Sequence, residues 1–141
     1  ESSEGDNFTL SSRRGRGVVL YFYPKDNTPG CTKEACGFRD LKGEFSAAGA
    51  EIVGVSPDSM KSHGNFIQKH SLNFPLLSDP DRKIAELYGV LKLKKMYGKE
   101  KPGIERSTFV VDQEGRIAAL WRKVKVDGHM DEALKFVREM T

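Results

Sequence analysis

Residues 18–56 have the sequence VVLYFYPKDNTPGCTKEACGFRDLKGEFSAAGAEIVGVS, in which three predicted elements follow one another. The first six residues, 18–23, are all β-branched, aliphatic or aromatic, which is typical of a strand covered on both faces. From Thr32 to about Ala48, apolar residues recur every three or four positions, and this spacing predicts an amphipathic helix. Residues 51–55 predict a second strand. A strand, a helix and a strand in this order favour a sheet whose first strands are parallel.

The rest of the chain continues the alternation and ends in a hairpin and a helix. The predicted segments are a helix at 56–70, a strand at 74–77, a short helix at 78–88, strands at 107–111 and 116–122, and a helix at 130–139. Residues 91–103 are rich in lysine and lack clear periodicity, so a long, basic, mobile loop is expected there. The order predicts an α/β fold: a mixed central sheet flanked by helices, parallel first and antiparallel at one edge.

Composition narrows the possible classes of protein. The 141 residues are enough for one domain, 1–141, and 38% of them are hydrophobic, which excludes a disordered chain. A net charge of +3 disfavours nucleic-acid binding, including by the basic segments 13–17 and 92–101. No apolar run approaches the roughly 20 residues of a membrane span, and residues 1–6 lack the features of a signal peptide. No membrane association and a cytoplasmic location are therefore expected.

Two cysteines, Cys31 and Cys36, are the candidate reactive groups. Cys31 is expected at the start of the first helix, where unpaired backbone N–H groups and the helix dipole favour a thiolate. The alternative is an inert, buried cysteine. In an ideal helix, residues five apart have Cα atoms roughly 8–9 Å from each other, whereas a disulfide needs less than about 7 Å. A Cys31–Cys36 disulfide would therefore require the helix to unwind; otherwise Cys36 is simply a core residue.

In the loop before Cys31, Pro24 ends the strand, and Pro29 and Gly30 stiffen and turn the backbone so that N–H groups can converge near the sulfur. Thr28 places a hydroxyl three residues before the thiol, where it can hydrogen-bond a bound oxygen. With this loop, the segment 21–39, YFYPKDNTPGCTKEACGFR, resembles the active-site segment of the peroxiredoxins, in the bacterioferritin comigratory protein or peroxiredoxin Q subgroup. The family's pattern of a proline, a threonine and a cysteine is matched by Pro24, Thr28 and Cys31. Further matching segments lie at 74–79, 96–99, 106–112 and in the last helix.

This resemblance implies a thioredoxin-like fold and a thiol-dependent peroxidase that reduces hydrogen peroxide and organic hydroperoxides without metal or cofactor. Cys31 matches the peroxidatic position and Cys36 the resolving position. Thr28, the Cys31 backbone N–H and Arg106 match the groups that bind and polarise the peroxide, with Pro24, Pro29 and Gly30 in the substrate-binding loop. The resemblance also implies a monomer that is recycled by thioredoxin or a similar dithiol reductant. The lead-in at residues 11–17 is shorter than the family's usual one.

Two other functions stay open on the residues alone. A general thiol-disulfide oxidoreductase has a similar fold but uses cysteines separated by two residues, and a non-catalytic binding module or holdase would not need the cysteines. Three further residues have ordinary structural interpretations. His63 and His70 are expected on the surface, since two imidazoles alone make a weak metal site, and Trp121 is expected to contribute to core or edge packing.

Overall fold

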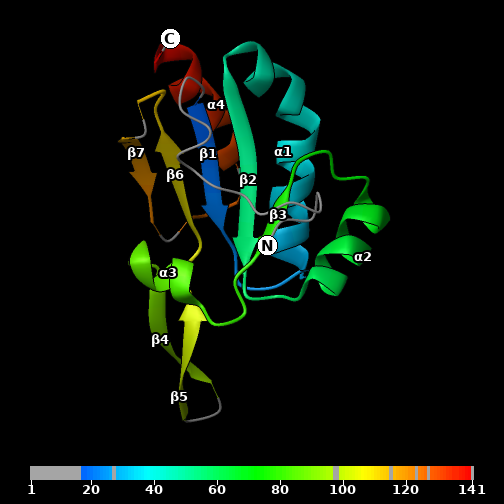
Figure 1. The fold of residues 1–141 in the computed structure, drawn as a ribbon, viewed down its shortest axis with the longest axis vertical. Helices are drawn as coiled ribbons and strands as arrows, with labels where there is room; N and C mark the ends of the chain where they lie inside the picture. Colours follow the sequence, from blue (N-terminus) through cyan, green and yellow to red (C-terminus); the bar gives the residue numbers. More distant parts are fainter. Residues whose placement is uncertain are drawn as a thin grey trace.

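A five-stranded mixed sheet forms the centre of the molecule (Figure 1). The computed structural model describes residues 17–26, 28–96, 99–114, 116–122, 124–126 and 128–140, with the backbone alone for 92–102 and Met140. The elements are β1 (Gly17–Phe22), α1 (Pro29–Ala47), β2 (Ala50–Ser56), α2 (Met60–His70), β3 (Leu76–Ser78), α3 (Lys83–Leu87), β4 (Leu91–Met96), β5 (Lys99–Ile104), β6 (Ser107–Val111), β7 (Ile117–Trp121) and α4 (His129–Met140).

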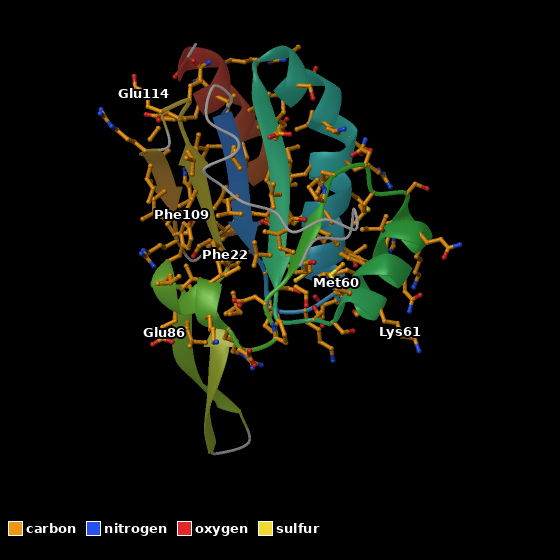
Figure 2. The ribbon with its side chains drawn as sticks, viewed as in Figure 1. Phe22, Met60, Lys61, Glu86, Phe109 and Glu114 are labelled. Carbon is orange, nitrogen blue, oxygen red and sulfur yellow. The ribbon has the colours of Figure 1, made fainter. Side chains whose placement is uncertain are left out.

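The sheet has the order β3-β2-β1-β6-β7, which makes β1 its central strand. β1 pairs in parallel with β2 and antiparallel with β6, so the predicted mixed sheet is confirmed. All six residues of β1 are buried, because α1, α2 and α4 cover one face of the sheet and α3 packs on the other. On the α3 face, Phe22 and Phe109 make an edge-to-face contact across β1 and β6, with ring centroids 5.7 Å apart (Figure 2).

Helix α1 follows the predicted amphipathic pattern but begins three residues earlier than expected. Pro29 occupies its first turn, a position where a missing N–H costs no hydrogen bond. Ala35, Phe38 and Phe45 are buried against the sheet. The helix ends at Ala47, and the chain then turns through Gly49, whose φ of +81° favours glycine. Cys31 and Cys36 both lie within this continuous helix.

One prediction about secondary structure was wrong. Residues 91–103 were expected to be a loop, but 91–96 and 99–104 form the antiparallel ribbon of β4 and β5, in which Leu91 pairs with Ile104 and Met96 with Lys99. Such a ribbon is held by backbone hydrogen bonds between its own two strands, so it needs no apolar periodicity to mark it in the sequence. It extends away from the main sheet in Figure 1.

The other elements agree with prediction within a few residues. The largest shift is at α3, which starts at Lys83 instead of Ser78. Helix α2 starts at Met60 instead of Ser56, because β2 continues to Ser56 and Ser59 is the N-cap. The expected basic segment 13–17 and the short lead-in at 11–17 fall almost entirely outside the described residues. In the described part of the chain, none of the helices combines the length and the apolar character needed to span a bilayer.

Gly54 provides a test of how tightly the sheet is packed against the helices. A Cβ added at Gly54 would lie 2.8 Å from Leu76 Cδ2 and 2.9 Å from Tyr21 Oη, and both side chains are buried. We therefore expect Gly54→Ala to destabilise the fold by about 1–3 kcal/mol in urea unfolding. Gly43→Ala is the control, because nothing lies within 4 Å of its Cβ position on α1; it should stabilise the fold by about 0.5–1 kcal/mol. Equal effects of the two substitutions would contradict this packing.

Candidate active site

The register of the central strands brings Arg106 to the start of α1. Phe22, the last residue of β1, pairs with Ser107, the first residue of β6. Arg106 precedes Ser107 and therefore lies at the end of β1, where the chain turns toward α1. Its backbone is fixed there, since the Val124 N–H donates to the Arg106 carbonyl at 2.9 Å. Residues 75 positions apart in the sequence can thus form one site.

Cys31 and Arg106 are in direct contact. Arg106 Nη2 donates a hydrogen bond to Cys31 Sγ at 3.2 Å. Cys31 is a free thiol, only 1% exposed, and it is the third residue of α1, beside the unpaired N–H groups of the first turn. The sulfur thus lies beside a guanidinium and a helix N-terminus, two kinds of group that interact favourably with negative charge. The prediction that Cys31 begins the first helix is confirmed.

Glu34 is the second side chain that Arg106 binds at this site. Arg106 Nη1 donates to Glu34 Oε1 at 2.7 Å, and the Glu34 side chain is completely buried. Among the described residues, none bonds its second oxygen, Oε2. Burial raises the pKa of Glu34 from 4.5 to about 7, although the Arg106 charge and hydrogen bond act in the opposite direction. Burial alone would lower the pKa of Arg106, but Glu34 and Cys31 outweigh it and raise that pKa.

The predicted loop residues surround this contact. Gly30 allows Arg106 to approach, because a Cβ at Gly30 would lie 3.2 Å from Arg106 Nη2. Thr28, the N-cap residue of α1, donates its hydroxyl hydrogen to the Lys25 carbonyl at 2.9 Å. The Thr28 oxygen therefore keeps its lone pairs as acceptors. Pro24 follows the strand, Pro29 opens α1, and Cys36 is a half-buried free thiol.

The expectation that His63 lies on the surface was wrong. Its ring is fully buried: Nδ1 is 2.8 Å from Asp26 Oδ2 and Nε2 is 2.9 Å from the Leu77 carbonyl. It is separate from His70, which packs on Phe66. The surface prediction failed because the partners of His63 come from other elements, and nothing in the helical spacing of α2 reveals them.

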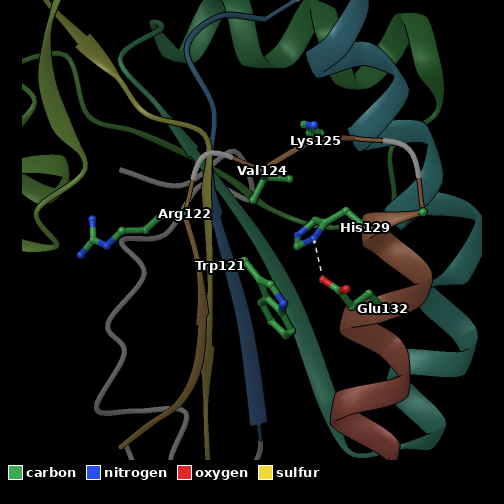
Figure 3. A pocket seen from close by; sticks show the side chains of 7 residues that line it. Trp121, Arg122, Val124, Lys125, His129 and Glu132 are labelled. Atoms are coloured by element: carbon green, nitrogen blue, oxygen red, sulfur yellow. Dashed lines mark ion pairs between the residues drawn. The ribbon is translucent and has the colours of Figure 1, made fainter.

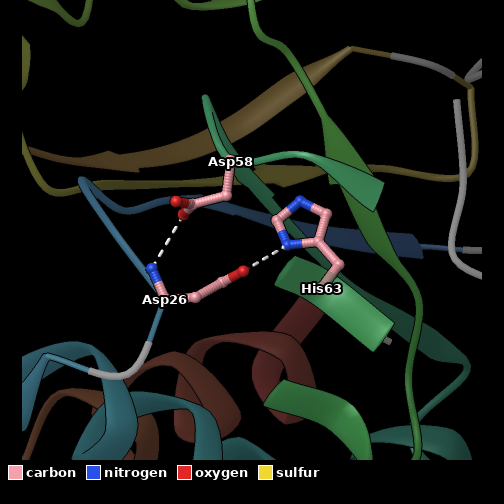
Figure 4. Close-up of side chains that lie close together, drawn as sticks. All are labelled: Asp26, Asp58 and His63. Atoms are coloured by element: carbon pink, nitrogen blue, oxygen red, sulfur yellow. Dashed lines mark hydrogen bonds and ion pairs between the residues drawn. The ribbon is translucent and has the colours of Figure 1, made fainter. Parts of the chain in front are cut away.

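Asp26, Asp58 and His63 are also the group of described side chains closest in composition to a metal site (Figure 4). However, Asp26 Oδ2 already accepts hydrogen bonds from Ser62 and His63. Asp58 Oδ2 accepts from the Asp26 N–H and from Ser56, both at 2.7 Å. A cation would have to displace these four bonds, so the donor set fits a hydrogen-bonded network better than a metal centre.

A second histidine, His129, lies in a pocket beside Trp121 and Glu132 (Figure 3). Its Nε2 is 2.7 Å from Thr108 Oγ1 on β6, and burial lowers the pKa of the ring. Trp121 is half-buried and makes edge-to-face contacts with His129 and Phe136, which confirms the packing prediction. Val124, which holds the Arg106 backbone, also lines this pocket, so the pocket wall helps to fix the arginine.

Comparisons with known proteins agree with this geometry. Residues 1–120 match the AhpC/TSA family. The chain belongs to that family. It is 53% identical over 141 residues to peroxiredoxin Bcp of Bacillus subtilis, covering all of this chain and 90% of the relative. It is also 53% identical over 133 residues to a putative peroxiredoxin bcp of Coxiella burnetii, covering 94% and 88%.

A solved structure shows the same architecture. The bacterioferritin comigratory protein of Xanthomonas campestris, described for alkyl peroxide reduction, superimposes with a TM-score of 0.94 at 49% identity, over 99% of this chain and 88% of that one. The sequence-derived family assignment is thus confirmed. The chain is a peroxiredoxin with the thioredoxin-like fold, and a thiol-dependent peroxidase.

Sequence reasoning missed Glu34 and the Asp26–His63 pair. Glu34 had a usable signal, because residues three apart on a helix share a face and Cys31 precedes it by three. The Asp26–His63 pair had none, since 37 residues separate its members. Helical spacing in the sequence can indicate that a charged side chain lies near a reactive cysteine. It does not indicate which distant segment of the chain packs against the loop before that cysteine.

Glu34 also predicts a pH dependence of stability. Because the folded-state pKa lies above the unfolded one, the stabilising contribution of protonated Glu34 is complete below pH 4.5 and is lost as pH rises through about 7. The loss between pH 5 and pH 8 should be about 2–3 kcal/mol. Glu34→Gln should remove this loss from the free energy of unfolding measured in urea at the two pH values.

The control for Glu34→Gln is Glu44→Gln, a half-exposed glutamate on the same helix. It should leave the difference between pH 5 and pH 8 as in the unsubstituted protein. If Glu34→Gln also leaves that difference unchanged, burial of a titrating Glu34 carboxyl is contradicted.

Proposed function

We propose that Cys31 is the peroxidatic cysteine of this thiol-dependent peroxidase and that hydrogen peroxide and organic hydroperoxides are its substrates. This proposal rests on the hydrogen bond from Arg106 Nη2 to Cys31 Sγ at the N-terminus of α1. The Cys31 thiolate attacks the terminal peroxide oxygen, so that an S–O bond forms as the O–O bond breaks. The leaving oxygen takes a proton and departs as water or an alcohol, and Cys31 becomes a sulfenic acid.

Arg106 stabilises the charge that moves onto the leaving oxygen. Glu34 binds the guanidinium at Nη1 and fixes its orientation. The N–H groups that face the sulfur can therefore donate to the peroxide oxygens. The Cys31 backbone N–H is a further donor at the helix start. Thr28, whose hydrogen is held by Lys25, accepts a hydrogen bond from the hydroperoxide O–H. Pro24, Pro29 and Gly30 shape the substrate-binding loop.

Cys36 is proposed as the resolving cysteine. Its thiol condenses with the Cys31 sulfenic acid, which forms a disulfide and releases one water. Because both residues lie in the continuous helix α1, the first turns of α1 must unwind before the sulfur atoms can meet. A dithiol reductant of the thioredoxin type then supplies two electrons and two protons and restores both thiols. We further propose that residues 1–141 act as one domain and as a monomer in the cytoplasm, where thiols are kept reduced.

Replacement of Arg106 tests this mechanism. Arg106→Lys keeps one positive charge but removes the forked donors, so the second-order rate constant of Cys31 with tert-butyl hydroperoxide should fall about a hundredfold. Rapid mixing, acid quench and intact-mass analysis measure that constant directly. Cys31→Ser gives the zero baseline, and Arg116→Lys, at an exposed arginine, is the matched control. A constant for Arg106→Lys equal to that of the control would contradict the proposed role.

A further inference from the structure

The loop between β1 and α1 is anchored at Asp26, five residues before Cys31. The Asp26 side chain is almost completely buried, and its carboxylate accepts three hydrogen bonds. The donors are Tyr23 Oη at 2.6 Å, Ser62 Oγ at 2.7 Å and His63 Nδ1 at 2.8 Å. The Asp26 N–H donates in turn to Asp58 at 2.7 Å. We call Asp26 and its three side-chain donors, Tyr23, Ser62 and His63, the Asp26 latch.

The latch contains a buried contact between a histidine ring and a carboxylate. His63 Nε2 faces the Leu77 carbonyl, which can only accept, so that nitrogen carries a hydrogen. His63 Nδ1 faces the Asp26 carboxylate, as Figure 4 shows. Burial by itself would raise the pKa of Asp26, but the hydrogen bonds from His63, Tyr23 and Ser62 outweigh it and lower that pKa. The side chains of Tyr23, Ser62 and His63 therefore all favour the ionised Asp26 carboxylate.

The latch ties the loop to elements that do not take part in the chemistry. Ser62 and His63 lie on α2, and Leu77 lies on β3. Asp58 is held by Ser56 of β2, and its carbonyl accepts from Ser78 of β3 at 2.6 Å. Helix α2 thus holds Asp26 directly, and β2 and β3 support it through Asp58 and His63, so that other elements anchor the upstream end of the loop between β1 and α1.

The segment just downstream begins α1 without side-chain capping at Thr28. Among the described residues, α1 has no side-chain cap at Thr28 and no acidic residue in its first turn. Contacts at this turn include the bond from the Thr32 N–H to the Thr28 carbonyl and the Arg106 bonds to Cys31 and Glu34. A residue anchored to other elements is therefore followed by a helix start without a side-chain cap at Thr28, and the boundary between them lies between Asp26 and Cys31.

We propose that the Asp26 latch positions the loop between β1 and α1. It holds reduced Cys31 against Arg106 and sets how often the first turns of α1 unwind. The consequence for disulfide formation rests on the proposed function of Cys31 and Cys36. A weaker latch opens the turn more often, which slows the attack on peroxide and speeds the transfer of oxidised Cys31 to Cys36. His63 and Ser62 act through the loop and do not touch the reacting atoms.

Two serines on α2 give a matched test. Ser62→Ala removes one latch donor, whereas Ser59→Ala removes only the N-cap bond that Ser59 Oγ accepts from the Ser62 N–H at 3.1 Å. Loss of a cap destabilises a helix, and alanine at position 62 is a better helix former than serine. Both substitutions should lower the urea midpoint, Ser59→Ala through the cap and Ser62→Ala through the lost bond to Asp26, but Ser62→Ala should have the larger effect at Cys31. With a purely structural role, the effect at Cys31 would follow the loss of global stability in both variants.

Amide hydrogen exchange of the reduced, full-length protein measures the opening directly. We expect Ser62→Ala to accelerate exchange at residues 28–36 about tenfold, as befits the loss of a hydrogen bond to a charged acceptor. Ser59→Ala should change it less than twofold there. If His63→Gln folds, it should accelerate exchange at residues 28–36 more than Ser62→Ala does. If it does not fold, the Ser62→Ala result alone tests the proposal. Equal acceleration by the two serine variants, or none in Ser62→Ala, would overturn the proposal.

A second measurement links the latch to the chemistry. Each protein is treated with increasing hydrogen peroxide, and intact mass gives the ratio of disulfide to sulfinic acid at Cys31. Ser62→Ala should raise that ratio severalfold over Ser59→Ala, and an unchanged ratio would contradict the effect on resolution. If the unsubstituted protein forms no intramolecular disulfide, the proposed role of Cys36 fails, while the exchange comparison still decides whether the latch positions the loop.

Discussion

The contact between the Arg106 guanidinium and the Cys31 sulfur requires three separately formed parts of the fold to meet. The antiparallel pairing of Phe22 with Ser107 sets the position of the arginine, and the start of α1 sets that of the sulfur. The third part is the loop between them, which Asp26 ties to α2 and β2. Arginine alone among the cationic residues offers two donors fixed in one plane, so it can hold Glu34 and the sulfur at the same time.

This site contains buried polar atoms without hydrogen-bond partners among the described residues, which a core selected only for stability would avoid. Glu34 is fully buried with one oxygen unpartnered among the described residues, and the hydroxyl of Tyr21 is in the same condition nearby. Burial and the Glu34 charge both raise the pKa of Tyr21 well above its ordinary value, so Tyr21 stays neutral. Such local violations concentrate at functional sites, where the surrounding fold supplies the missing stability. Here that support comes from the two buried clusters on either face of β1.

The sequence predicted the parts of the fold that depend on local periodicity. The buried run of β1 and the apolar spacing of Ala35, Phe38 and Phe45 determine the strand and helix that carry Cys31. The ribbon of β4 and β5 escaped prediction, because its backbone pairing leaves no such periodic pattern.

The chemistry of the site was predictable only where a motif carries it. Pro24, Thr28 and Cys31 form a recognisable pattern, and Arg106 followed from the same resemblance. Glu34 could have been found from its helical spacing to Cys31. The partners of His63 could not, because they come from the loop after β1 and from β3, and only the tertiary fold brings them together.

The central claim is that one helix presents Cys31 to peroxide and then unwinds to give the sulfur to Cys36. The most direct test mixes the fully reduced protein with one equivalent of hydrogen peroxide and measures intact mass and free thiols. The account predicts loss of two hydrogens and of both thiols, which only a Cys31–Cys36 disulfide within one chain produces. Gain of one oxygen with one thiol remaining, or no change at all, would contradict it.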